Sequence, residues 1–456
     1  NIFDNSENDP RLKGVSSISD SNTTIIKKGV FTSCKKNDDC PPWSISAGEI
    51  KHNKMKKQII YKDAVLKIYD LPVLYFPKFF HPDPSVKRQS GILQPEINSS
   101  NNLGNSVTLP YFKVISNNKD LTLNPTLFDG NTSMLTTEYR AINEKNKILA
   151  DVGYVNGYKS TTTNKKSSLS HYFLDIDHDL KLEDFNSSDL KLSLKKVSND
   201  TYLKVFDQHI TKSSLRPENF DNLNSSLKLF LDHENFIFET GIKSFENLQI
   251  ENKSDRYQYN LPYYNYDKLV EQDYFNGTID FNSNGNNYLS ETNKLETNII
   301  NNFIYNSADY VSDFGLKNNF SLSLKNLNSI GKKTSQYKSN PQMEIASLLN
   351  VDFSMPLEKK SNNSNNILIP KISFRFNPSD MKNYSSSENK IDAGNVFAIN
   401  RLGLSDTLEA GKSITLGLDY NNEKKNSLDQ INNYFELKLA TVLRDKEENF
   451  IPNKST

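Results

Sequence analysis

SITLGLDY, residues 413–420, alternates apolar and polar side chains along its whole length. The even-numbered positions carry Ile, Leu, Leu and Tyr, and the odd-numbered positions carry Ser, Thr, Gly and Asp. Successive side chains of a β-strand point to opposite faces of the sheet. The stretch therefore predicts a strand with one apolar and one polar face.

The same alternation recurs from about residue 100 onward, over roughly 350 residues with many aromatic side chains and almost no helical window. It is seen in LKLSLK (190–195), YQYNL (257–261), FSLSLK (320–325), ISFRFN (372–377) and FELKL (435–439). Polar spacers of unequal length separate these stretches, which is typical of an antiparallel transmembrane barrel. A soluble β-sandwich and an adhesin-like solenoid also alternate, and periodicity alone does not separate the three folds.

The first 87 residues have a different organisation. Residues 44–75 string together short apolar stretches with close turns, which predicts stacked β rungs of a jelly-roll or solenoid. Pro72 and Pro77 follow and suit edge positions or bends. We therefore expect an all-β chain with a partial β-jelly-roll at residues 1–87 and a large antiparallel barrel at residues 88–456.

Composition sets few limits on function. Of the 456 residues, 55 are Lys or Arg and 55 are Asp or Glu, so the formal net charge is zero and no global field attracts nucleic acid. No apolar run reaches the length of a membrane-spanning helix, and no P-loop is present. Asn and Ser are used heavily, a bias to which the sequence alone assigns no function.

Several long motifs occur in a fixed order along the chain. They are FTSC…CPPW (31–43), DLPVLYFPKFFHPDPSVKRQSGILQP (70–95), LGNSVTLPYF (103–112), KDLTLNP (119–125) and EYR (138–140). Later come VSNDTYLKVF (197–206), DRYQYNLPYY (255–264), PKISFRFNPSDMKN (370–383) and NRLGLSDTLEAGKSITLG (400–417). Together they resemble the lipopolysaccharide-assembly outer-membrane protein family, LptD, also called the organic-solvent-tolerance family, in its alphaproteobacterial type.

This resemblance implies a two-part transporter in the cell outer membrane. A periplasmic jelly-roll would receive lipopolysaccharide from a bridge of similar domains (LptA-like). A barrel plugged by a lipoprotein (LptE-like) would insert it among the outer-membrane lipids through a lateral gate. No cofactor, metal or catalytic activity is implied. We expect the chain to be a fragment without the start of the jelly-roll and the last barrel strands. A porin, a barrel enzyme such as a lipase and a surface adhesin are the alternatives.

The stretch HPDPSVKRQSGILQP (81–95) admits two interpretations. His81 and Asp83 could form an acid–base pair, but prolines hold them in extended backbone and the serines lack a G-x-S-x-G elbow. Pro95 and Pro110 instead interrupt strand-like runs and remove donors from one place in a sheet. The resemblance implies that they loosen the first two barrel strands at the lateral gate. Bulges at strand ends are the alternative.

Two further sets of residues are candidate contacts with lipid. Lys87 and Arg88 could pair with lipid phosphates or acidic sugars, or be a solvated pair at a domain junction. Ala64, Leu66 and Ile68 share one strand face and could line a path for acyl chains. An ordinary packed core predicts the same pattern.

Cys34 and Cys40 are the only cysteines in the chain. In a protein exported from the cytoplasm, as the resemblance implies, they could form a local disulfide. Zinc, with His52 as a third ligand, is the rival, although close CxxC pairs are absent. In some relatives the matching cysteine pairs with one near the carboxyl end of the barrel. We expect the local pair.

Overall fold

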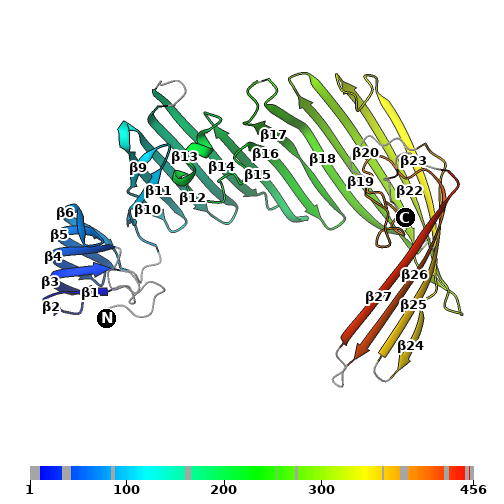
Figure 1. The fold of residues 1–456 in the computed structure, drawn as a ribbon, viewed down its shortest axis with the longest axis horizontal. Helices are drawn as coiled ribbons and strands as arrows, with labels where there is room; N and C mark the ends of the chain where they lie inside the picture. Colours follow the sequence, from blue (N-terminus) through cyan, green and yellow to red (C-terminus); the bar gives the residue numbers. More distant parts are fainter. Residues whose placement is uncertain are drawn as a thin grey trace. The chain divides into compact units, whose positions relative to one another are not determined.

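The computed structural model describes residues 11–32, 43–83, 88–159, 166–252, 254–272, 276–361, 364–380, 389–425, 431–446 and 451. In these residues almost every element is a strand, and the strands form two antiparallel sheets (Figure 1). The all-β prediction is confirmed. The described residues contain no helix that is long and apolar enough to cross a membrane.

The first sheet has six strands in the described part of the chain. They are β1 (Arg11–Lys13), β2 (Ser16–Ser19), β3 (Thr23–Thr32), β4 (Trp43–Asn53), β5 (Gln58–Ile68) and β6 (Leu71–Pro82). Strands β3 to β6 pair in sequence order, and β1 and β2 both pair with β3. The core on one side of this sheet includes Ile26, Phe31, Ile50, Ile59, Tyr61 and Leu66.

A bend crosses the first sheet at one position. Lys62 pairs with Glu49 and Ala64 pairs with Ala47, so that Asp63, with a φ of 51°, and the opposed Gly48 are both left out of the ladder without a change of register. The bend reverses the alternation, and Tyr61 and Ala64 are therefore buried on the same side although their numbers differ in parity. The sequence predicted separate short strands here, whereas the structure has the single bent strand β5.

The second sheet begins with short strands and has 21 strands in the described residues. Its first strands are β7 (Gly91–Ile92), β8 (Glu96–Ser100), β9 (Gly104–Thr108), β10 (Tyr111–Ser116), β11 (Lys119–Phe128), β12 (Ser133–Ile142), β13 (Asn146–Lys159), β14 (Lys166–Asp179) and β15 (Phe185–Val197). The short helices η1 (Asp129–Asn131), α1 (Tyr202–Val205) and η2 (Asp207–His209) lie in connections.

Most of the later strands of the second sheet have 12 to 16 residues, and β21 and β24 are short. They are β16 (Asn222–His233), β17 (Phe236–Asn247), β18 (Tyr257–Gln272), β19 (Gly277–Ser290), β20 (Lys294–Ser307), β21 (Tyr310–Val311), β22 (Lys317–Lys332), β23 (Gln342–Ser354), β24 (Leu357–Ser361), β25 (Ser364–Asn377), β26 (Gly411–Lys425) and β27 (Ile431–Arg444). The chain divides into two compact units, residues 1–177 with 194–220 and residues 178–193 with 221–456.

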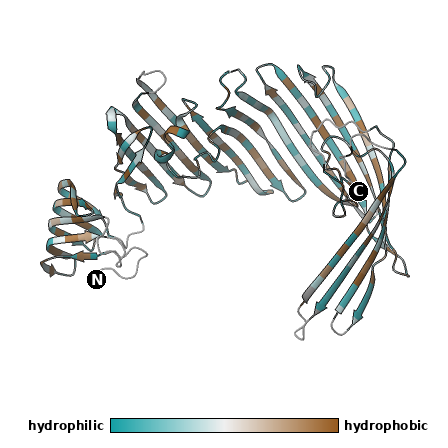
Figure 2. Cartoon of the chain, in the orientation of Figure 1, coloured by the Kyte–Doolittle hydropathy of each residue, from teal (hydrophilic) through white to brown (hydrophobic). Residues whose placement is uncertain are grey.

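In the second unit, hydropathy alternates residue by residue along the strands (Figure 2). Ser413 and Thr415 of β26 lie on a face against which residues 389–410 pack, and we call it the segment face. The opposite face exposes large apolar side chains, among them Phe320, Leu349, Phe374, Leu416, Leu439 and Leu443. An apolar face of this extent requires a non-aqueous neighbour.

Candidate functional site

The first hairpin of the second sheet is interrupted where Pro95 and Pro110 lie. Pro95 falls between β7 and β8, and Pro110 falls between β9 and β10. β7 pairs with β10 and β8 pairs with β9, but the register shifts by one residue between the two halves. Each of the first two strands is thus split at its proline.

The split leaves backbone groups without their usual reciprocal bonds. The register of β7 with β10 places Leu93 opposite Pro110, and the Leu93 N–H donates to the Pro110 carbonyl at 2.8 Å. A directly opposed pair of this kind normally exchanges two bonds, and Pro110 has no N–H to return. The Leu109 N–H likewise donates to the Pro125 carbonyl of β11 at 3.1 Å, and Pro125 returns none. Pro125 ends the motif KDLTLNP, but its role depends on the strand pairing and is not evident from the sequence alone.

Arg88 lies just before this hairpin and is held by ion pairing. It pairs with the buried carboxylate of Asp120, which also pairs with Arg140 at 2.8 Å. Arg88 also donates to the Asn117 carbonyl at 2.5 Å. The motifs that contain these residues therefore meet at one end of β10, β11 and β12. Lys87 lies outside the described residues.

Residues 198–221 fold back onto the first strands and place α1 and η2 against them. Tyr202, Leu203 and Phe206 are buried, and the His209 Nε2 lies 2.8 Å from Ser106 Oγ of β9. The Tyr202 hydroxyl lies 2.9 Å from Nδ1 of His171, a fully buried residue of β14. Burial and the nearby charge of Asp151 raise the pKa of Tyr202, and burial lowers the pKa of His209. Both polar groups are thus neutral at pH 7 and fix the segment.

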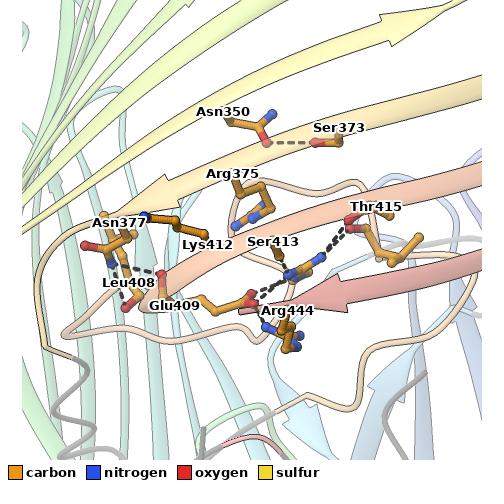
Figure 3. Close-up of polar contacts among 12 residues, drawn as sticks. Asn350, Ser373, Arg375, Asn377, Leu408, Glu409, Lys412, Ser413, Thr415 and Arg444 are labelled. Carbon is orange, nitrogen blue, oxygen red and sulfur yellow. Dashed lines mark hydrogen bonds and ion pairs between the residues drawn. The ribbon is translucent and has the colours of Figure 1, made fainter. Parts of the chain in front are cut away.

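Residues 389–410 form a second docked segment, in the other unit. Arg401 is fully buried and donates to both carboxylate oxygens of Glu409, at 2.6 and 2.5 Å, and to Ser413 and Thr415 of β26 at 3.1 Å each. Arg444 of β27 pairs with the same carboxylate of Glu409 (Figure 3). Burial alone would raise the pKa of Glu409, but hydrogen bonding and charge from Arg401, with help from neighbouring arginines, lower it to about 2.

Neighbouring strands hold the same segment through its carbonyl groups. Arg375 of β25 donates to the Ala398 and Ile399 carbonyls at 2.9 and 2.6 Å. Lys325 of β22 donates to the Leu404 and Ser405 carbonyls at 3.2 and 2.9 Å. Arg375 and Lys325 therefore anchor the segment to the face of the sheet. The sequence alone did not identify the anchoring roles of Arg375 and Lys325. For Arg401 and Glu409, the charges between the leucines of the motif NRLGLSDTLEAG were the available signal.

The remaining predicted residues lie in or near the first sheet. Ala64 and Leu66 are buried in its core and Ile68 is half-buried. His81 and Asp83 each contact another residue: His81 Nε2 lies 2.6 Å from the Tyr61 hydroxyl, and an Asp83 carboxylate oxygen lies 2.5 Å from His52 Nε2.

The predicted disulfide and the rival zinc site both depend on Cys34 and Cys40. These residues contain no group of three or more His, Cys, Asp or Glu side chains that could hold a metal ion. Cys34 and Cys40 lie outside the described residues, so the disulfide stays a prediction.

A sequence model of the LptD family, LPS transport system D, matches residues 169–449. The chain belongs to the LptD family. Similar proteins include the LPS-assembly protein LptD of Idiomarina loihiensis, 30% identical over 184 residues, which are 40% of this chain and 23% of that protein. The LptD of Pseudoalteromonas translucida is 32% identical over 30% of this chain and 18% of its own length. The LptD of Acinetobacter baylyi is 29% identical over 37% of this chain and 20% of its own length.

The matched part of this chain thus spans less than a quarter of each of these LptD relatives. Family membership confirms the resemblance inferred from the motifs. The alphaproteobacterial type stays a prediction, and so does a domain boundary near residue 87.

Proposed function

We propose that this chain is part of an outer-membrane translocon that receives lipopolysaccharide from the periplasm and inserts it into the outer leaflet. The family match over residues 169–449 carries the proposal. The second unit supports it, because one face of its strands exposes apolar side chains that lipid would cover. In the proposal the sheet closes into a barrel, and its segment face lines the lumen.

The first sheet would be the periplasmic jelly-roll in this scheme. It would take lipopolysaccharide from a bridge protein of the LptA kind, with acyl chains sheltered along Ala64, Leu66 and Ile68. A lipoprotein of the LptE kind would plug the barrel. The translocon has no catalytic activity in this proposal, and guidance and gating constitute the mechanism.

The split hairpin would be the lateral gate. Prolines at 95, 110 and 125 lower the number of backbone bonds that must break for the first strands to separate. Alanine at 110 would supply an N–H facing the Leu93 carbonyl, and alanine at 125 one facing the Leu109 carbonyl. Each added bond stabilises the closed form by about 1 kcal/mol, so the Pro110→Ala, Pro125→Ala variant should open roughly 30-fold less often.

The test uses the full-length protein as the sole copy in its own bacterium. Depletion should stop newly made lipopolysaccharide from reaching the cell surface, and unchanged delivery would refute the proposed function in favour of a porin. The proline variant should slow delivery, whereas Pro370→Ala, in β25 away from the hairpin, should not. Equal delivery rates for the two variants would refute the gate while leaving the transport function intact.

A further inference from the structure

The turn between β4 and β5, residues 54–57, reads Lys-Met-Lys-Lys, and we call it the lysine turn. All four side chains are exposed, and that of Met55 is 77% exposed. Lys51 precedes the turn, and residues 51–57 contain no Asp or Glu. The turn therefore presents positive charge and one apolar side chain to its surroundings.

The positive charge of the lysine turn is part of a larger imbalance. Residues 11–83, which span the first sheet, contain 13 Lys or Arg and 7 Asp or Glu, in a chain whose formal net charge is zero. Asp20 lies next to the turn, but its carboxylate accepts two backbone N–H groups at 2.7 and 2.6 Å. Lys54 donates to the Asp20 carbonyl at 2.7 Å. The exposed ammonium groups of Lys56 and Lys57 are open to an anionic partner.

The lysine turn is fixed to the point where the chain leaves the first sheet. The Asp83 N–H donates to the Lys57 carbonyl at 3.0 Å. The Asp83 carboxylate lies 2.5 Å from Nε2 of His52, and both side chains are buried. The lysine turn and the residue that follows β6 are therefore held together.

The chain reaches the second sheet a few residues later. Arg88 donates to the Asn117 carbonyl in the two-residue turn between β10 and β11, whereas the long residues 198–221 join β15 and β16 at the opposite strand ends. Short turns lie at the periplasmic end of an outer-membrane barrel. Asp83 precedes Arg88 by five residues, which span at most about 18 Å. In the proposed barrel, chain length thus keeps the lysine turn near the periplasmic strand ends.

The chemistry of the lysine turn suits a lipid surface. The ends of barrel strands lie near the lipid headgroups, because the apolar band between the ends matches the hydrocarbon layer. Lysine clusters beside membrane-embedded segments bind anionic headgroups, and the attraction falls off within a Debye length, about 8 Å at physiological salt. An apolar side chain among the lysines adds to binding by entering the headgroup layer. Three lysines and an exposed methionine provide both contributions.

We propose that the lysine turn docks on the periplasmic leaflet of the outer membrane. Lys56 and Lys57 bind the phosphate groups of anionic phospholipids, and Met55 enters the headgroup layer. Arg88, a predicted lipid contact in this part of the chain, is instead paired with Asp120. The inference rests on the outer-membrane location that belongs to the proposed function. Docking would orient the first sheet on the membrane by a contact other than the chain connection.

The first test is photocrosslinking of purified full-length protein in bilayers of phosphatidylcholine, with or without phosphatidylglycerol. A photoreactive amino acid replaces Met55, and in a matched control it replaces Lys28, which is exposed at the bend of the first sheet. The lipid yield at 55 should be roughly tenfold higher with phosphatidylglycerol, and the yield at 28 should be low in both bilayers. Equal yields at 55 and 28, or a yield at 55 that is independent of phosphatidylglycerol, would overturn the inference.

A second test removes charge. Lys56→Gln, Lys57→Gln should lower the yield at 55 in the mixed bilayer roughly tenfold, and high salt should lower it in the wild type. Lys27→Gln, Lys28→Gln removes the same charge from exposed positions at the bend and should leave the yield unchanged. An equal loss in the two variants would contradict docking by the lysine turn.

A third bilayer, with lipopolysaccharide in place of phosphatidylglycerol, distinguishes the two sources of phosphate. Crosslinks at 55 to lipopolysaccharide and none to phosphatidylglycerol would overturn the inference. Loss of surface delivery on depletion together with crosslinks that are independent of phosphatidylglycerol would refute docking alone. Unchanged delivery on depletion would refute the transport function.

Discussion

Removal of the negative charge of Glu409 should release residues 389–410 from the segment face. Glu409→Gln keeps the side-chain volume but leaves the fully buried Arg401 without its carboxylate. The lowering of the Glu409 pKa from 4.5 to about 2 corresponds to about 3 kcal/mol of folded-state stabilisation. Removal of one partner of a buried ion pair generally costs about 3–5 kcal/mol, which agrees with the value obtained from the pKa of Glu409. In Glu409→Gln, the docked form of residues 389–410 should therefore lose about 3 kcal/mol of stability relative to the undocked form.

Thiol labelling measures this loss directly. Leu402→Cys places a reporter at a fully buried position of the segment, in a background in which Cys34 and Cys40 are replaced by serine. The thiol reacts when the segment undocks, so the labelling rate should rise roughly 100-fold in Glu409→Gln. Glu436→Gln removes an exposed carboxylate that pairs with Lys438, and it should change the rate less than twofold. Equal rates for wild type and Glu409→Gln would refute the reasoning.

The pH dependence of docking follows from the same carboxylate. Its pKa is lowered on folding, so the stabilisation is fully present above about pH 4.5 and is lost as the pH falls towards 2. With a dipyridyl disulfide, which labels thiols in acid, undocking of the wild type should be constant from pH 8 to 5 and rise below about 4.5. Glu409→Gln should show no such acid rise. A rise in wild-type labelling already between pH 7 and 5 would contradict the assignment to Glu409.

Three further predictions concern the first unit, and each is checked in the full-length protein. His171→Phe leaves the buried Tyr202 hydroxyl without the ring nitrogen 2.9 Å away, and should lower the free energy of unfolding by about 1–3 kcal/mol in urea titrations. Gly153→Ala puts a Cβ 2.3 Å from the His171 ring, and should cost about 1–3 kcal/mol in the same titrations. Asp63→Val, at a φ of 51°, should speed hydrogen exchange in β5 more than Asp63→Gly, by roughly tenfold.

Strand alternation was predictable because it depends only on neighbouring residues. SITLGLDY was assigned two faces from its own pattern, and Ser413 and Thr415 do share the face that receives Arg401. YQYNL shows the limit of that reasoning, because the pairing of β18 with β19 shifts between Asn260 and Tyr263. A bulge reverses the faces beyond it, and its position depends on the partner strand.

The docked segments were not predictable, because their contacts are distant in the sequence. Lys325 reaches a carbonyl 80 residues away, and Ser106 meets a histidine 103 residues away. Residues 378–410 show no strand or helix periodicity, and their composition is that of a loop between two strands. In the sequence, Arg401 and Glu409 resemble any other charged residues, and only the folded structure shows that they form a buried ion pair. The prolines differ, since a missing N–H belongs to the residue itself, and Pro95 and Pro110 were therefore identifiable.

The proline break separates two halves of the first hairpin that are anchored independently. The half with β8 and β9 is held by the His209 contact to Ser106 and by a buried bond between the hydroxyls of Thr108 and Thr126 at 2.7 Å. The half with β7 and β10 is held by Arg88 on Asp120. Between the two halves, opposed residues share one backbone hydrogen bond where such a pair usually shares two. Because a sheet separates most readily where fewest bonds must break, opening in the proposed gate would start at the break rather than at either strand end.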